Sequence, residues 1–137
     1  SNMPDSFSQL SGKNVVVRGY VEDLGEIFDH CRLSVAPLRY GAGIKGKIVT
    51  SLSYGVPCVA TAIAKEGMGL THGENILVAE TVEDFAHVVV EVYKSAELWN
   101  KLSSNGLEVV REKFSIESVR SALHDVLLEL GLGGCMR

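Results

Sequence analysis

Apolar residues gather in four short runs along the chain. The runs cover residues 14–20, 33–37, 57–61 and 75–79, and Arg18 is the one charged residue among them. Short apolar runs of this kind are typical of strands that are buried on both faces of a sheet. The hydrophobic pattern therefore predicts four short β-strands.

Apolar residues three and four positions apart predict helices between and after these runs. The first predicted helix covers residues 23–31, with Asp23 as its N-cap. A second covers about residues 44–54, because Gly55 occupies the position at which a glycine commonly ends a helix. Three more are predicted over residues 82–94, 96–113 and 116–130, with Thr81, Ser95 and Ser115 as N-caps.

Strands that alternate with helices at this spacing predict βαβ units and a parallel sheet covered on both faces. The expected fold class is therefore α/β, a Rossmann-like open parallel sheet with flanking helices and a helical C-terminal end. The length of 137 residues suits one domain. We expect the domain to cover residues 14–131, after an N-terminal remnant or partial strand–helix region (1–13) and before a tail (132–137).

The charge balance argues against a polynucleotide partner. Thirteen basic and seventeen acidic residues give a formal charge of −4, and the basic residues are scattered rather than clustered. Proteins that bind nucleic acid usually carry a basic face that neutralises phosphates. No apolar run approaches the roughly 20 residues of a membrane span, and residues 1–14 are too polar for a signal peptide.

The cysteines and histidines show no metal or disulfide pattern. Three cysteines make an odd number at wide spacing, and the four histidines lack the spacing of metal ligands. No metal and no cofactor is expected, and a cytoplasmic, reducing setting is the simplest interpretation.

A glycine-rich loop is the most informative candidate site. In open α/β sheets, ligands bind beyond the carboxyl ends of the strands, which here directs attention to residues 20–23, 38–44 and 62–68. The middle loop places Gly41 and Gly43 directly before a predicted helix. Glycines let a backbone approach a ligand closely, and the free N–H groups of a helix start attract anions such as a diphosphate.

Two lysines near this helix start support the same hypothesis. Lys45 and Lys47 place positive charge where it opposes the helix dipole, which an anion bound between them would explain. Residues two apart do not share a helix face, so one of them is expected to face the anion, and Lys45 is preferred. The alternative is an ordinary turn with two solvated lysines.

Other residues carry weaker signals. Glu66 is either a hydrogen-bond acceptor for a sugar hydroxyl or an acid at the start of a helix. Arg39 and Tyr40 either stack on a ligand ring or lie in solvent. No GxSxG motif is present, and no catalytic residue can be assigned.

Most of the chain, from about residue 14 to residue 114, resembles a known family. It is similar to the donor-binding C-terminal lobe of retaining, nucleotide-sugar-dependent glycosyltransferases of the GT-B fold, the glycosyl transferases group 1 type. The motifs that carry the resemblance are the strand ending at Gly19, Asp23, residues 41–47, the Gly55-x-Pro57 step and the Glu66–Gly67 pair.

The resemblance implies a nucleotide-sugar donor (UDP-, GDP- or ADP-linked) and transfer of its sugar to an acceptor hydroxyl. The glycine loop and its helix would hold the diphosphate and sugar, Lys45 would assist the phosphates, and Tyr20 and Val21 would lie by the nucleobase. The expected binding residues are Gly19, Tyr20, Val21, Gly41, Ala42, Gly43, Ile44, Lys45, Lys47, Thr50 and Glu66. Catalysis would stabilise charge on the departing diphosphate by a metal-independent route, with retention at the anomeric carbon.

The sequence departs from the family pattern in two ways. Ala42 and Thr50 stand where many members carry glutamates, so the contacts to the ribose are expected to be weaker. Nothing before Asn14 resembles the strand and helix that usually supply an Arg and a Lys for the diphosphate, and we expect the N-terminal acceptor lobe to be missing from this chain. We expect a fragment that binds donor weakly and does not turn over. Two alternatives are a lobe of a nucleotide-sugar epimerase and a non-catalytic nucleotide-binding or interaction module.

Overall fold

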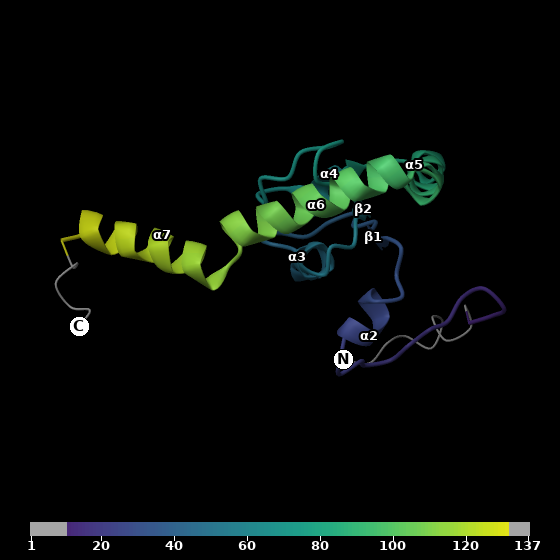
Figure 1. The fold of residues 1–137 in the computed structure, drawn as a ribbon, viewed down its shortest axis with the longest axis horizontal. Coiled ribbons are helices and arrows are strands. Elements are labelled where there is room, and N and C mark those ends of the chain that lie inside the picture. The colour runs from purple at the N-terminus through teal and green to yellow at the C-terminus, as the bar shows by residue number, and fades with distance from the viewer. Residues whose placement is uncertain (1–10, 132–137) are drawn as a thin grey trace.

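Three short parallel strands form the centre of the molecule, with helices on both sides (Figure 1). The computed structural model describes residues 11–131. Its elements are α2 (Gly25–Phe28), β1 (Ser34–Ala36), α3 (Gly46–Ser53), β2 (Cys58–Ala60), α4 (Ala62–Lys65), β3 (Leu77–Val78), α5 (Val82–Lys94), α6 (Ala96–Lys113) and α7 (Ile116–Glu129). The predicted class, a Rossmann-like open parallel sheet with flanking helices, is confirmed.

The strands follow one another across the sheet in the order β1, β2, β3. Ala36 lies opposite Ala60, and Ala60 opposite Val78. Neighbouring residues of a strand point to opposite faces. Cys58 and Ala60 accordingly pack into one hydrophobic cluster, and Val59 into another.

Helix α6 takes part in both clusters. The first cluster includes Ile48 and Leu52 of α3 and Val109 near the end of α6. The second includes Val92 of α5 and Leu102 in the first half of α6. Both faces of the sheet are therefore covered, as a parallel sheet requires.

The predicted caps of the C-terminal helices are confirmed. The side chains of Thr81, Ser95 and Ser115 each accept a hydrogen bond from the backbone N–H three residues further on, at 3.0–3.1 Å. Gly55 ends α3 with a φ of 68°, a left-handed conformation that glycine adopts at little cost. The sequence predicts these helix ends because a capping residue and the backbone group that it binds lie only a few residues apart.

The predicted strand over residues 14–20 is wrong. The segment forms one isolated antiparallel bridge, between Gly12 and Val15, and is otherwise irregular. Val16 and Tyr20 are 74% and 94% exposed. A strand forms only beside a neighbour that completes its hydrogen bonds, and no described strand pairs with this segment. The described sheet therefore has three strands, not four.

Two helix starts also differ from the predictions. Asp23 accepts a hydrogen bond from the N–H of Gly25 at 2.8 Å, but Leu24 is the residue that directly precedes α2, and α2 is shorter than residues 23–31. Helix α3 begins at Gly46 rather than near Ile44 because Lys45 has an extended backbone (φ −89°, ψ 91°). The short helix α4 has no counterpart among the predictions.

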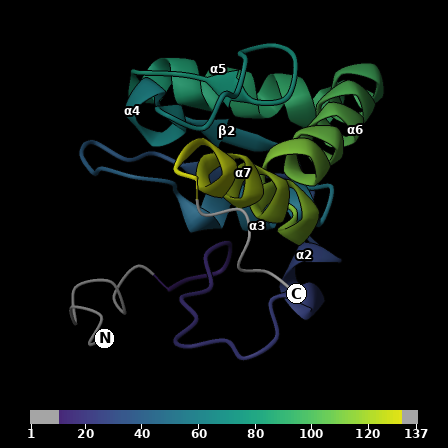
Figure 2. The same cartoon turned by 90° about the vertical axis from the view of Figure 1, so that its left-hand side faces the viewer.

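Helix α7 leaves the body of the molecule after α6 and projects beyond the sheet (Figures 1 and 2). None of its residues is buried. Its exposed apolar residues form a stripe at three- and four-residue spacing, Ile116, Val119, Leu123 and Val126. Among the described helices, none is both long and apolar enough to cross a membrane.

Candidate functional site

The loops that follow the three strands leave the sheet at the same edge, because the strands are parallel. They begin at Pro37 after β1, at Thr61 after β2 and at Ala79 after β3. This carboxyl edge is where open α/β sheets bind their ligands. The glycine loop singled out in the sequence lies there, since it leads from β1 to α3.

The glycine loop has a backbone that its glycines make possible. Gly41 has a φ of 141° and Gly43 a φ of 75°, both in the region that residues with a Cβ rarely adopt. Ala42 between them and Ile44 after them are exposed. The loop therefore presents main chain rather than a packed side-chain surface.

Lys45 fastens this loop. Its ammonium donates hydrogen bonds to the carbonyl oxygens of Gly41, at 3.3 Å, and Gly43, at 2.5 Å. An ammonium has three N–H donors, so one remains for another acceptor. Lys45 directly precedes the first residue of α3.

The amino end of α3 offers two further donors. The N–H groups of Ile48 and Val49 bond to the carbonyl of Lys45, and no group within residues 11–131 accepts from the N–H of Gly46 or Lys47. Gly46 and Lys47 are exposed. Free backbone N–H groups and the positive end of the helix dipole together favour an anion.

Thr50 belongs to helix α3, whereas Glu66 lies after helix α4. Thr50 lies one turn into α3 and is half-buried, so it belongs to the same region as Lys47. Glu66 is exposed and follows the last residue of α4. The interpretation of Glu66 as an acid at a helix start is therefore wrong, because the helix beside it ends there.

The structure does not join the N-terminal candidates to the loop. Gly19, Tyr20 and Val21 lie in the irregular segment before α2. Within the part of the chain that the structure describes, no hydrogen bond, ion pair or ring contact links them to residues 41–50. Residues 41–50 form one region, and residues 19–21 are separate from it.

A cavity of about 380 Å³ lies at the carboxyl edge, where all three strands end. Its lining residues are Pro37, Arg39, Thr61, Glu80, Thr81, Val82 and Phe85. Of these, Arg39 was noted in the sequence, whereas Thr61, Glu80 and Thr81 were missed. The available signal was their position: Thr61 ends one predicted strand, and Glu80 and Thr81 follow another, which places their polar side chains at the ligand-binding edge.

Glu80 is exposed and lines this cavity, where one hydrogen bond holds its side chain in place. One of its carboxylate oxygens accepts a hydrogen bond from the N–H of Ala62 at 2.7 Å, which connects the loop after β3 to the start of α4. The Thr61 hydroxyl donates to the carbonyl of Leu38 at 2.7 Å and so connects the loops after β1 and β2. The cavity wall is thus built from three segments that are distant in sequence.

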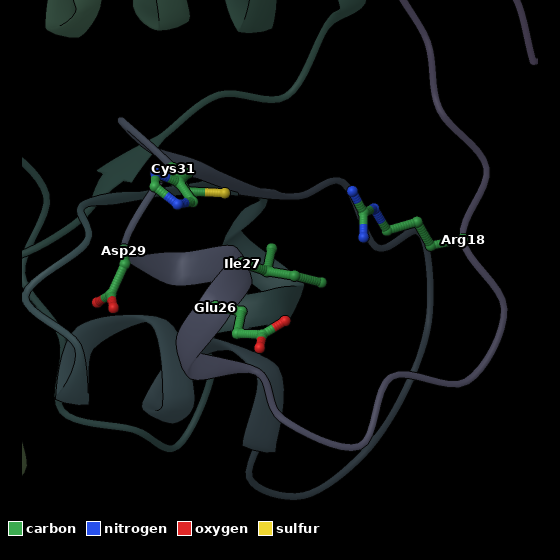
Figure 3. Close-up of a pocket in the computed structure, with 6 residues that line it drawn as sticks. Arg18, Glu26, Ile27, Asp29 and Cys31 are labelled. Carbon is green, nitrogen blue, oxygen red and sulfur yellow. The ribbon is translucent and has the colours of Figure 1, made fainter.

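A second hollow, of about 580 Å³, lies beside α2 and is more polar (Figure 3). Arg18, Glu26, Ile27, Asp29, His30 and Cys31 line it. In Figure 3, Glu26 and Ile27 point from α2 toward the side on which Arg18 lies, and Asp29 points away from it. Its residues 29–31 lead into the amino end of β1, so this hollow is not formed by the loops of the carboxyl edge.

The described residues show no metal cluster and no activated thiol. No group of three or more His, Cys, Asp or Glu side chains within residues 11–131 could hold a metal ion. Burial raises the pKa of the Cys58 thiol, while the Ser34 hydroxyl and Lys47 act in the opposite direction. A buried thiol with a raised pKa is a poor nucleophile.

Comparison with known proteins agrees with this geometry. A sequence profile described as Glycosyl transferases group 1 matches residues 2–95, more than half of the chain. The chain is also 26% identical over 110 residues to an "Uncharacterized 44.6 kDa protein in cps region" of Klebsiella pneumoniae, across 80% of this chain. The aligned part spans 28% of that relative's length. The parallel sheet with its glycine loop and the profile match together place the chain in the group 1 glycosyl transferase family.

Proposed function

We propose that the chain is the donor-binding lobe of a retaining, nucleotide-sugar-dependent glycosyltransferase with two such lobes. The observation that carries the proposal is the glycine loop at the carboxyl edge, which ends in a helix start with unpaired N–H groups. Family membership makes a sugar transfer the expected reaction of the whole enzyme. A diphosphate is the anion that links the nucleotide and the sugar of such a donor.

The diphosphate would bind at the start of α3. The N–H groups of Gly46 and Lys47 supply two hydrogen bonds, and the remaining N–H of the Lys45 ammonium supplies a third. Hydrogen bonds to charged groups contribute about 1.5–3 kcal/mol each. Lys47 adds charge from the first turn. Because Lys45 precedes the helix, the two lysines need not share a helix face to reach one anion.

The other donor contacts rest on the family resemblance and on position. The Thr50 hydroxyl, one turn into α3, is placed to bond to a ribose hydroxyl, more weakly than the glutamate of many members would. Gly19, Tyr20 and Val21 would reach the nucleobase only if the segment before α2 lies closer to the glycine loop in the whole enzyme. Glu66 remains a proposed acceptor for the sugar.

In the whole enzyme, the N–H groups of Gly46 and Lys47 and the Lys45 ammonium would stabilise the negative charge that develops on the departing diphosphate. A separate acceptor lobe would bring the hydroxyl that attacks the anomeric carbon. The chain spans 28% of its Klebsiella relative, which leaves ample length for such a lobe in an enzyme of that size. We expect no transfer by this chain alone, and a cytoplasmic location stays a prediction.

Replacement of Lys45 in the full-length enzyme tests this assignment. Lys45→Ala should lower kcat/KM for the donor by about 10- to 150-fold, which corresponds to the loss of one charge-assisted hydrogen bond. Lys94→Ala, at the exposed end of α5, removes a lysine far along the chain from the glycine loop and should have little effect. Steady-state kinetics with matched thermal unfolding would separate a binding defect from a folding defect. Unchanged kinetics in Lys45→Ala would remove the lysine from the site.

A further inference from the structure

Strand β3 lies at an edge of the described sheet. It comes last in the order β1, β2, β3, so no described strand lies on its side away from β2. The N–H of Ala79 donates to the carbonyl of Ala60 at 3.0 Å and so faces the sheet. Backbone groups alternate in direction along a strand, so those of Ile76 and Val78 face the open edge.

The turn before β3 binds both of these outward groups. The N–H of Gly73 donates to the carbonyl of Ile76 at 2.9 Å. The N–H of Val78 donates to the Nδ1 atom of the His72 ring, also at 2.9 Å. His72 and Ile76 form an isolated parallel bridge. Residues 72 and 73 therefore cover an edge that would otherwise be open to a strand of another molecule.

The rest of the turn is held independently of the His72 ring. The buried side chain of Asn75 accepts a hydrogen bond from the N–H of Thr71 at 2.9 Å. Lys101 of α6 forms an ion pair with Glu74 at 2.8 Å, and Asn105 of α6 donates to the Glu74 carbonyl at 2.9 Å. Loss of the His72 contact should therefore open the edge locally and leave the turn attached to α6.

The bond from Val78 requires a particular state of the His72 ring. A ring nitrogen accepts a hydrogen bond only when it carries no proton, so here the neutral ring has its proton on Nε2. In the imidazolium form both nitrogens are donors, and Nδ1 would face the Val78 N–H with a second donor. Protonation of His72 and its bond to Val78 therefore exclude each other. The ring is exposed, so protons of the solvent reach it.

Histidine is the residue type around this turn that ordinarily changes charge between pH 5 and 8, whereas glutamate and lysine ordinarily titrate outside that range. Besides Glu74 and Lys101, the charged groups that hold the turn are Lys65 of α4 and Lys113 of α6, which donate to main-chain carbonyls just before it at 3.3 and 3.0 Å. Helix α5 packs in the same cluster as Leu77 of β3. Its charged and titratable residues are Glu83, Asp84, His87, Glu91 and Lys94. No hydrogen bond or ion pair joins any of these side chains to His72 within residues 11–131.

We propose that His72 is a pH-dependent cover of the β3 edge. Neutral His72 holds the Val78 N–H and closes the edge, and protonated His72 releases it and opens the edge. The direction follows from the contact, because only the open turn leaves Nδ1 free to bind a proton, so acid favours the open edge. This inference does not depend on the proposed glycosyltransferase function.

Hydrogen exchange of the Val78 amide in the isotope-labelled chain tests the proposal. Each exchange rate would be divided by that of an unstructured peptide at the same pH, which gives a protection factor. The factor for Val78 should fall about two- to twelvefold from pH 7.5 to pH 5.5, as expected for the loss of one hydrogen bond. The factor for Ala79, whose N–H bonds to β2, should change by less than about twofold. Equal protection of Val78 at the two pH values would overturn the proposal.

Nitrogen chemical shifts of the His72 ring provide a second measurement that needs no variant. At pH 7.5 they should show the proton on Nε2 and an unprotonated Nδ1. A proton on Nδ1 at that pH would overturn the proposal, because the ring could then not accept from Val78.

Three variants separate the titration of His72 from its shape. His72→Asn keeps a side-chain oxygen that can accept near the position of Nδ1 but does not titrate, so protection of Val78 should become independent of pH. His72→Phe keeps a ring without an acceptor, so protection should be low at both pH values. His87→Asn changes an exposed histidine of α5 that makes no hydrogen bond with a described residue, and it should keep the pH dependence of the unaltered chain. Persistence of the pH dependence in His72→Asn, or its loss in His87→Asn, would contradict the assignment. Thermal unfolding would verify that the variants are folded.

Discussion

Lys45 organises the glycine loop through two hydrogen bonds. Its ammonium bonds to two carbonyls of the loop, and its backbone turns the chain into α3. A cation near a helix start normally opposes the helix dipole. The two carbonyl contacts offset part of that cost, so the position of Lys45 alone does not require an anion. The unpaired N–H groups of Gly46 and Lys47 are the stronger support for one.

The burial of the cysteines predicts how fast each one reacts with an alkylating reagent. Cys58 is 2% exposed and burial raises its pKa, whereas Cys31 is half-buried. Because the thiolate is the reactive form, iodoacetamide should label Cys31 before Cys58, and Cys58 should stay unlabelled until the chain unfolds. As the pH rises through the ordinary pKa of a cysteine thiol, the Cys58 thiol of the unfolded chain loses its proton before that of the folded chain does. Cys58 should therefore lower the free energy of unfolding at alkaline pH.

Peptide mapping by mass spectrometry after timed alkylation measures each cysteine separately. The difference in labelling rate between Cys31 and Cys58 should be largest under native conditions and should disappear in denaturant. If Cys31 and Cys58 were labelled at equal rates in the folded protein, Cys58 would not be buried from the reagent, which would contradict the structure.

Whole helices were easier to predict than strands. The three C-terminal helices begin where Thr81, Ser95 and Ser115 predicted, because a cap and an amphipathic stripe are local signals. The run over residues 14–20 has a strand-like composition but no pairing strand in the described sheet. A strand depends on a neighbour that is distant in sequence, which composition cannot supply.

Helix α6 contributes to both cores, which leads to a prediction about Leu102. Leu102 is fully buried against Val59 and Val92, so Leu102→Ala should lower the free energy of unfolding by about 2–5 kcal/mol. Leu123→Ala, on the exposed stripe of α7, is the matched control and should change it by less than about 0.5 kcal/mol. Urea denaturation of both variants measures this. A comparable loss in the two would mean that α7 is packed as firmly as α6.

At the scale of the whole molecule, the sequence predicted one part of the carboxyl edge and missed another. The glycine loop was found because its glycines and its helix are adjacent in sequence. The cavity around Glu80 was missed because Pro37, Thr61 and Glu80 come together only when the three strands are aligned in register. Both features lie at the carboxyl edge of the sheet.

The unfolding temperature of the chain with UDP, GDP or ADP shows directly whether a diphosphate binds where the glycine loop meets α3. A nucleotide at about ten times its Kd stabilises the folded state by about 1.4 kcal/mol, which should raise the Tm by roughly 3–6 °C. We expect this increase for at least one nucleotide, its loss in Lys45→Ala and its retention in Lys94→Ala. No increase with any of the three, or an equal increase in Lys45→Ala, would contradict it.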